Sequence, residues 1–265
     1  MQLTLDGGLE STSRSTNGPG IPGPLAMAPA TGTKLQAASL KLQASSSKLD
    51  KGPVSGYSVL QNKGESMQVK EALKITDSFT RTSKMPGLSY SLPAWACKTG
   101  QKLAKIPGTP CYGCYAMKGN YTRYPAIKRA QYRRLEAIKH PDWVAAMVAV
   151  IKRQKWFRWH DAGDVQSPEH MQKILEVCRL TPDTKHWLPT QERQYLPDPE
   201  QVPDNLVIRL SRSKLDGPVP AAWSHDSGVT TGEARTCPAP DQGGKCLDCR
   251  ACWNKDIKSV IYGKH

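Results

Sequence analysis

The chemistry in this sequence is concentrated in its eight cysteines, seven of which form two closely spaced groups. The first group consists of Cys97, Cys111 and Cys114. The C-x2-C pair within it lets two thiolates from a single turn bind the same metal ion or cluster. Three thiolates without an evident fourth ligand nearby are typical of a [4Fe-4S] cluster in which one iron stays open to a small ligand. The alternative is a zinc site that a distant His or Cys completes.

A second group of cysteines lies near the C-terminus, where four of them occur within a short segment. They are Cys237, Cys246, Cys249 and Cys252. The C-x2-C-x2-C run resembles the ligand pattern of ferredoxins, although zinc would use the same thiolates. We therefore expect a second [4Fe-4S] cluster or a zinc ion here, unless one of these thiolates completes the first site instead.

The eighth cysteine, Cys178, stands apart from both groups. It shares helical spacing with Met171, Ile174 and Leu175, which predicts a buried thiol without a ligand role. Eight cysteines without a secretory signal predict a reducing compartment, where clustered thiols are more often metal ligands than disulfides. We therefore expect a cytoplasmic protein.

Polar and ionisable residues follow two of the predicted strands directly. In a parallel sheet, the carboxyl ends of the strands border the usual ligand crevice, so such residues are candidates for binding a cofactor. The alternative is a tight turn in which Asp164 and Ser167 only cap the next helix. The candidate cofactor-binding residues are His160, Asp161, Asp164 and Glu192.

The elements that must position these residues alternate short apolar runs with helical periods, which is the rhythm of a parallel βα sheet or barrel. Apolar runs predict strands at 88–92, 156–160, 186–189 and 206–210. Apolar periodicity and capping residues predict helices at 125–139, 143–153 and 167–179. A complete eightfold barrel needs roughly 250 residues, so the fold class we expect is α/β with a partial βα barrel.

Composition divides the chain into three parts. In residues 1–55, 25 residues are Gly, Pro, Ser or Thr and none is aromatic or Cys, so we expect a disordered leader. Residues 56–225 are expected to form the partial barrel with the first cysteine loop. Residues 226–265 are expected to form a cysteine-rich, metal-binding C-terminal extension.

The charge of the chain is strongly positive, with 37 Lys and Arg against 23 Asp and Glu. This balance permits nucleic acid or another anionic partner. The predicted helix region 123–139 is basic, and Lys128, Arg129 and Arg133 share part of one of its surfaces, as in a phosphate-binding surface. A merely solvated helix face is the alternative. No run of 18 apolar residues occurs, so we expect no membrane span and no membrane partner.

Three stretches of the sequence resemble the phage gene product 88 family. They are CYGCYA at 111–116, WHDAGD at 159–164 and CLDCRACW at 246–253. The resemblance runs from about Leu88 to the C-terminus. It implies a viral or prophage origin, and hence a place in the host cytoplasm, but no particular activity.

More distantly, the chain is similar to radical S-adenosylmethionine enzymes, in which three cysteines after the first strand of a βα barrel hold a [4Fe-4S] cluster. That resemblance implies an open iron that binds S-adenosylmethionine and a C-terminal auxiliary cluster. However, thirteen residues separate Cys97 from Cys111, where the usual motif is C-x3-C-x2-C. Cluster binding is therefore better supported than cleavage of the cofactor, and enzymatic activity is left open.

Two functions of different class follow from the sequence. The first is an iron–sulfur protein of phage type on a radical-SAM-like scaffold, which binds S-adenosylmethionine or another small molecule at its cluster. The second is a zinc-stabilised phage protein that binds nucleic acid through the basic helix. An interaction protein with inert metal sites is a third alternative.

Overall fold

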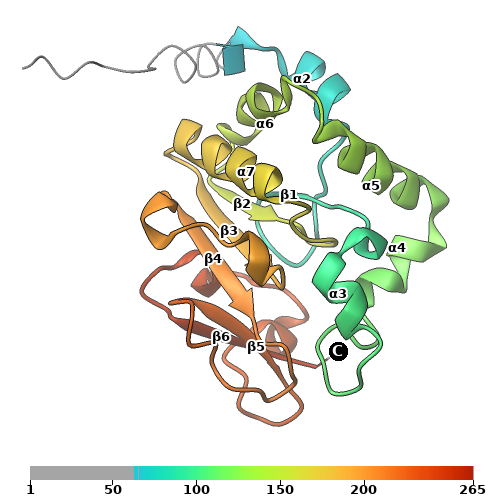
Figure 1. Cartoon of the computed structure of the whole chain (residues 1–265), viewed down its shortest axis with the longest axis vertical. Coiled ribbons are helices and arrows are strands. Elements are labelled where there is room, and N and C mark those ends of the chain that lie inside the picture. Colours follow the sequence, from blue (N-terminus) through green and yellow to red (C-terminus); the bar gives the residue numbers. More distant parts are fainter. Residues whose placement is uncertain (1–62, 65, 265) are drawn as a thin grey trace, which may run out of the picture. The chain divides into compact units, whose positions relative to one another are not determined.

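A computed structural model describes residues 63–64 and 66–264, so the predicted leader at 1–55 lies outside the described residues. One six-stranded sheet organises the described part, and all neighbouring strands in it are parallel. The strands lie side by side in chain order, β1 to β6 (Figure 1). A doubly wound sheet would reverse its order at a switch point, whereas consecutive order is shared with βα barrels. The α/β class with a parallel sheet is thus confirmed, and its radical-SAM type stays a prediction.

The strands are β1 (Leu88–Tyr90), β2 (Trp156–Trp159), β3 (Lys185–Thr190), β4 (Leu206–Ser211), β5 (Asp226–Thr230) and β6 (Ser259–Gly263). The first four coincide with the strands predicted from apolar runs. The last two were not predicted, and β5 pairs with β4 on one side and with β6 on the other. The segment 226–265, expected as an extension, therefore contributes two strands to the same sheet as the predicted barrel.

The helices are α2 (Val69–Thr76), α3 (Lys98–Leu103), α4 (Asn120–Arg123), α5 (Pro125–Ala137), α6 (Trp143–Ile151) and α7 (Pro168–Leu180). Single 3-10 turns are η1 (Ala94–Ala96), η2 (Tyr115–Met117), η3 (Arg193–Tyr195), η4 (Pro199–Gln201), η5 (Ala239–Gln242) and η6 (Ala251–Trp253). The three predicted helices are confirmed as α5, α6 and α7. Proline begins two of them, where its missing N–H costs nothing.

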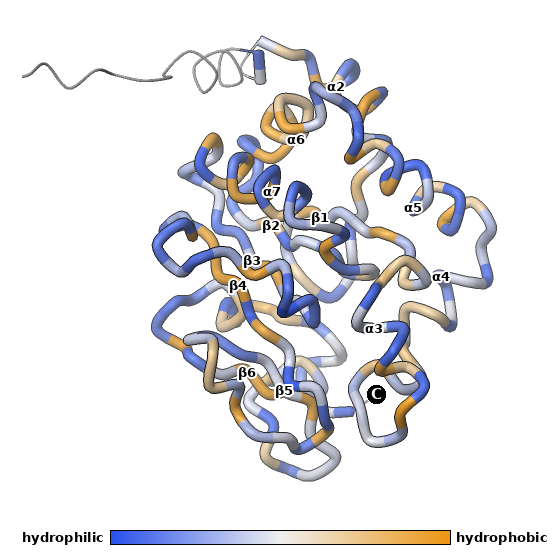
Figure 2. The backbone as a smooth tube through the Cα atoms, in the orientation of Figure 1, coloured by the Kyte–Doolittle hydropathy of each residue, from blue (hydrophilic) through white to orange (hydrophobic). Residues whose placement is uncertain are grey.

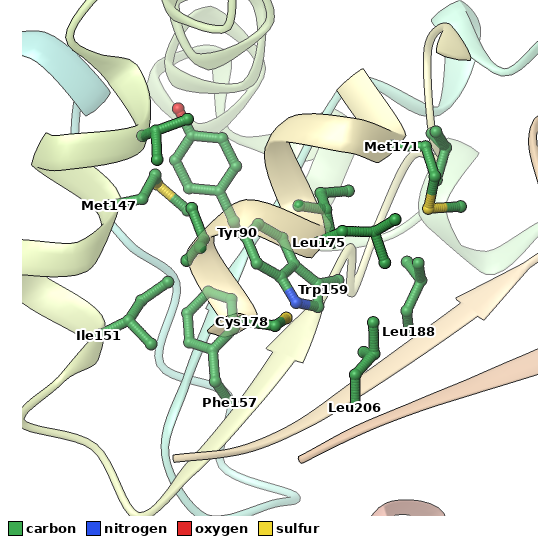
Figure 3. Close-up of a cluster of buried hydrophobic side chains, with 14 of the residues drawn as sticks. Tyr90, Met147, Ile151, Phe157, Trp159, Met171, Leu175, Cys178, Leu188 and Leu206 are labelled. Carbon is green, nitrogen blue, oxygen red and sulfur yellow. The ribbon is translucent and has the colours of Figure 1, made fainter. Parts of the chain in front are cut away.

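Helices α6 and α7 pack on one face of the first strands, and the main core lies between them (Figures 1 and 3). Every residue of α6 is buried, and Figure 2 shows the helix as largely apolar. Neither α6 nor any other helix of the described residues is long and apolar enough to cross a membrane. Cys178 lies fully buried in this core, as predicted (Figure 3).

The opposite face of the sheet carries two arginines, of which Arg158 is partly buried and Arg209 is fully buried. Register aligns Arg158 with Ser89 and with Trp187, and its guanidinium lies 4.5 Å from the centre of the Trp187 ring. Arg209 of β4 is fully buried and donates hydrogen bonds to six backbone carbonyls. Five of these carbonyls lie at 251–258, so Arg209 fixes the chain that follows the last cysteine to the sheet.

Candidate functional site

The first cysteine loop begins just after β1 and is fixed to the end of β3 by one carboxylate. Glu192 is fully buried, and its Oε1 accepts hydrogen bonds from the backbone N–H groups of Lys98 and Thr99, both at 2.8 Å. Its Oε2 accepts a third from the Thr99 hydroxyl at 2.7 Å. The N–H groups at the start of a helix lack partners within the helix, so Glu192 caps α3. Cys97, directly before α3, is thereby held at the carboxyl ends of the strands.

Two thiols of this loop border the same small space. A Cβ built on Gly100 would lie 3.6 Å from the Cys97 sulfur and 3.8 Å from the Cys111 sulfur. Cys114 belongs to the same turn, since its N–H donates to the carbonyl of Cys111 at 3.1 Å. Gly113 between them has a φ of +71°, a conformation that costs glycine little. Gly113 therefore allows the tight turn that brings Cys114 close to Cys111.

Burial and neighbouring acidic groups raise the pKa of two of these thiols, Cys97 and Cys111. Burial raises the pKa of Cys97 far above its usual value, and Asp164, Cys114 and Cys111 raise it further. Burial also raises the pKa of Cys111 to about 12, with Cys114 and Asp164 adding to the effect. A bound cation reverses this balance, because a coordinated thiol loses its proton. A metal ion or cluster bound by this loop would therefore favour the thiolate forms.

Asp161 anchors the two tyrosines that follow Cys114. One of its carboxylate oxygens accepts a hydrogen bond from the Tyr121 hydroxyl at 2.9 Å, and the other accepts one from Ser89. The backbone carbonyl of Asp161 accepts a hydrogen bond from Tyr115. The carboxylate thus joins the end of β1 to the loop, and its two oxygens are both engaged.

Asp164 joins the ends of β2 and β3. It accepts hydrogen bonds from the Thr190 hydroxyl at 2.6 Å and from the backbone N–H groups of Gln191 and Val165 at 2.8 Å. Burial outweighs these bonds and raises the pKa of Asp164 to about 7. The capping of α7 is performed by Ser167, whose hydroxyl accepts the N–H of His170 at 3.1 Å.

His160 occupies a different environment from the three carboxylates. Its Nδ1 lies 3.0 Å from the carbonyl oxygen of Tyr90, and its ring packs against His170 of α7 with 5.3 Å between centroids. Burial lowers the pKa of His160 to about 4, which keeps the imidazole neutral. Glu192 and Asp161 thus hold the cysteine loop and the tyrosines after it, Asp164 joins the ends of β2 and β3, and His160 packs under α7. Cofactor binding by these four residues stays a prediction.

The second cysteine group belongs to the segment of the chain that connects β5 to β6. All four thiols line one small cavity of about 20 Å³ together with Trp253 and Val260. Cys249 donates its N–H to the carbonyl of Cys246 at 2.9 Å, and Cys246 donates its own to Lys84 at 2.7 Å. Lys84 precedes β1, whereas Cys237 donates its N–H to the carbonyl of Ile261 within β6 at 3.0 Å. The first group, by contrast, lies at the carboxyl ends of the strands.

Cys252 of the second group contacts a tyrosine of β6. Its sulfur lies 3.2 Å from the Tyr262 hydroxyl. Burial raises its pKa to about 11, although Tyr262, Arg209 and Arg158 each lower it. Sequence reasoning did not single out the two arginines. A charged residue inside an apolar strand, as in WFRW and LVIRL, is the signal that marks them.

The thiols of the described chain are all free, and none forms a disulfide. Within residues 63–64 and 66–264, no group of three or more His, Cys, Asp or Glu side chains is arranged so that it could hold a metal ion. The four C-terminal thiols therefore share a cavity without converging on one point. Whether either group binds zinc or iron stays a prediction.

Fold and site together define an α/β protein with a consecutively ordered parallel sheet and two separate cysteine groups. The chain matches the family described as Gene product 88 over residues 60–255, so it belongs to this phage family, as its three motifs predict. No curated protein and no solved structure matches it. The relationship to radical S-adenosylmethionine enzymes stays a prediction.

Proposed function

We propose that this protein binds an iron–sulfur cluster through Cys97, Cys111 and Cys114. The observation that carries the proposal is the loop geometry beside Gly100. Two of the thiols border one space there, and Glu192 holds the loop over the strand ends. The donor set fits an iron–sulfur cluster because thiolates are its usual ligands.

The number of thiols favours a cluster over a single ion at this loop. A structural zinc ion usually takes four protein ligands, and this loop supplies three cysteines. In a [4Fe-4S] cluster each cysteine binds a different iron, so three cysteines hold three irons and leave the fourth open to another ligand.

The consecutive strand order and the place of the loop after β1 support the proposed radical-SAM-like scaffold. A cluster held by three cysteines supplies an iron with a free coordination position. We propose S-adenosylmethionine as the small molecule that binds there. Asp161 and Glu192 serve this site by holding the loop, since their carboxylate oxygens are engaged in hydrogen bonds.

The second cysteine group suits a single ion. A cavity needs roughly 10–15 Å³ to hold one water molecule, so the cavity of about 20 Å³ has room for a particle of that size. Zinc with four thiolate ligands fits this donor set and would draw the thiols together. We therefore propose structural zinc at Cys237, Cys246, Cys249 and Cys252, rather than a second cluster.

The test is elemental analysis of anaerobically purified protein and two matched variants. The wild type should contain about four irons and one zinc. The Cys97→Ala/Cys111→Ala/Cys114→Ala variant should lose the iron and keep the zinc, whereas Cys237→Ala/Cys249→Ala should do the reverse. Cys178→Ser changes neither set and serves as a control. S-adenosylmethionine should change the electron paramagnetic resonance spectrum of the reduced wild type.

Two results would contradict the proposal directly. Colourless wild-type protein that contains only zinc after anaerobic reconstitution would exclude the cluster. Equal iron in the wild type and the triple variant would show that the iron binds elsewhere. An unchanged spectrum with S-adenosylmethionine would remove only the small-molecule part of the proposal.

A further inference from the structure

Helix α5 presents a basic surface with an aromatic ring at its centre. Lys128, Arg129, Tyr132 and Arg133 line an open hollow there together with Pro125. Residues three and four apart are neighbours on a helix surface, so these side chains form one continuous face. The Tyr132 side chain is 42% exposed. We call this set the α5 face.

The opposite side of α5 is fixed to the end of β1 by buried polar side chains. Arg134 donates to the carbonyls of Ser78 at 2.6 Å and Ser91 at 3.1 Å. Gln131 donates to the Ser91 hydroxyl at 2.9 Å. The helix is thus held rigidly by residues other than those of the α5 face, which take no part in the core.

The cations of the α5 face are largely uncompensated. Arg133 lies 3.3 Å from an Asp77 carboxylate oxygen, in an ion pair that is open to solvent. Lys128 and Arg129 form no ion pair with any of the described residues. The Lys128 ammonium instead lies 4.5 Å from the centre of the Trp95 ring. This surface therefore attracts anions, in keeping with the excess positive charge of the chain.

Further aromatic rings accompany these charges at the amino end of α5. Tyr124, directly before α5, is half exposed, and Trp95 lies beneath Lys128. Basic grooves with accessible aromatic rings are typical of proteins that bind single-stranded nucleic acid, because bases stack on the rings while phosphates meet the cations. In a duplex the faces of the bases are already stacked, so the tyrosine favours a single strand.

We propose that the α5 face binds single-stranded nucleic acid, with phosphates at Lys128 and Arg129 and a base stacked on Tyr132. Trp95 is two residues from Cys97, so a strand bound here would pass beside the first cysteine loop. The proposal does not rest on the cluster. It is tested in the wild type and again in the Cys97→Ala/Cys111→Ala/Cys114→Ala variant.

The charge is tested by fluorescence anisotropy with a labelled oligonucleotide of about 12 thymidines. The Lys128→Ala/Arg129→Ala variant should bind at least tenfold more weakly. Its slope of log affinity against log salt should be shallower by about 1.4, since two phosphate contacts are lost. The control Arg153→Ala/Lys185→Ala removes the same charge from exposed positions beside the amino ends of β2 and β3. It should bind like the wild type.

The stacking is tested with two substitutions of the same tyrosine. Tyr132→Ala should weaken binding about fivefold or more, and Tyr132→Phe should retain it, because the ring rather than the hydroxyl stacks. Circular dichroism confirms that each variant is folded. Equal losses in the two double variants, no loss in Tyr132→Ala, or stronger binding to duplex than to single strands would each overturn the proposal.

Discussion

Glu192 and Thr99 are joined by two hydrogen bonds, although they lie 93 positions apart in the chain. The Thr99 N–H donates to one carboxylate oxygen at 2.8 Å and its hydroxyl donates to the other at 2.7 Å. The pair connects the end of β3 to the first turn of α3, next to Cys97. The position of the first cysteine loop therefore depends on a residue that lies outside it.

Loss of the Glu192 carboxylate should loosen this loop. Hydrogen bonds to a charged group contribute about 1.5–3 kcal/mol each, so we expect Glu192→Ala to lower the free energy of unfolding by about 3 kcal/mol. We also expect less iron per chain after anaerobic reconstitution. Urea denaturation and iron analysis measure the two effects. Glu200→Ala, at an exposed position of η4, is the control. Iron content equal to that of the wild type would contradict this role for Glu192.

Gly100 should be required for the space between the thiols. A Cβ there would lie only 2.9 Å from the Cβ of Cys97 and would border the sulfurs of Cys97 and Cys111. Alanine is more favourable than glycine in a helix by about 1 kcal/mol, which offsets the cost of this close contact. Gly100→Ala should therefore leave the free energy of unfolding nearly unchanged but reduce the bound iron severalfold. Gly232→Ala, which meets no close neighbour, should bind iron normally. If Gly100→Ala binds as much iron as the wild type, the space beside Gly100 is not required for the cluster.

The strands and helices that the sequence predicts are those in which an apolar run or a periodic apolar spacing indicates burial. Runs such as LVIRL in β4 and the periodic spacing in α7 remain apolar because they face the core. Strand β5 reads DSGVT, and its buried polar residues are satisfied by tertiary partners. Asp226, for example, accepts a hydrogen bond from Arg212 at 2.6 Å. No local pattern reveals such a strand.

In the candidate site, too, the sequence reveals some features and not others. Spacing alone groups the thiols, because ligands that share a turn must be close in sequence. The direction of a side chain is set by backbone angles that the sequence does not reveal. His160 has a φ of +56°, which turns its ring toward His170, whereas Asp161 beside it faces Ser89 and Tyr121. Two adjacent ionisable residues thus have different surroundings.

Arg209 should be essential for the chain around the second cysteine group. Its guanidinium donates to the carbonyls of Cys252 at 3.1 Å and of Ala251 at 2.7 Å, besides four others. Because buried acceptors without donors cost about 1–3 kcal/mol each, Arg209→Met should destabilise the protein by at least about 3 kcal/mol in urea denaturation. Zinc content should fall with it. Arg153→Met, at an exposed position, should change stability by less than about 0.5 kcal/mol. A similar small change in both variants would refute this role.

Acid should destabilise the fold through buried histidine. His186 of β3 is fully buried, its Nε2 lies 2.9 Å from the Thr181 hydroxyl, and burial lowers its pKa to about 3. An unfolded histidine titrates near 6.5. The unfolded state therefore binds protons first, and the stability that His186 contributes above pH 6.5 is lost progressively as the pH falls toward 3.

The His186→Phe variant isolates this effect, because it cannot titrate and keeps an aromatic ring beside Trp159. Asp164, whose pKa is raised to about 7, has the opposite effect: its protonation increases the unfolding free energy as the pH falls from 7 to 4. This contribution is the same in the wild type and in His186→Phe. We expect the unfolding free energy of the wild type, relative to the variant, to fall between pH 6.5 and 4. Urea denaturation across this range measures it, and His140→Phe at an exposed position should leave the pH dependence unchanged. A constant difference between the wild type and His186→Phe would show that His186 titrates alike in both states.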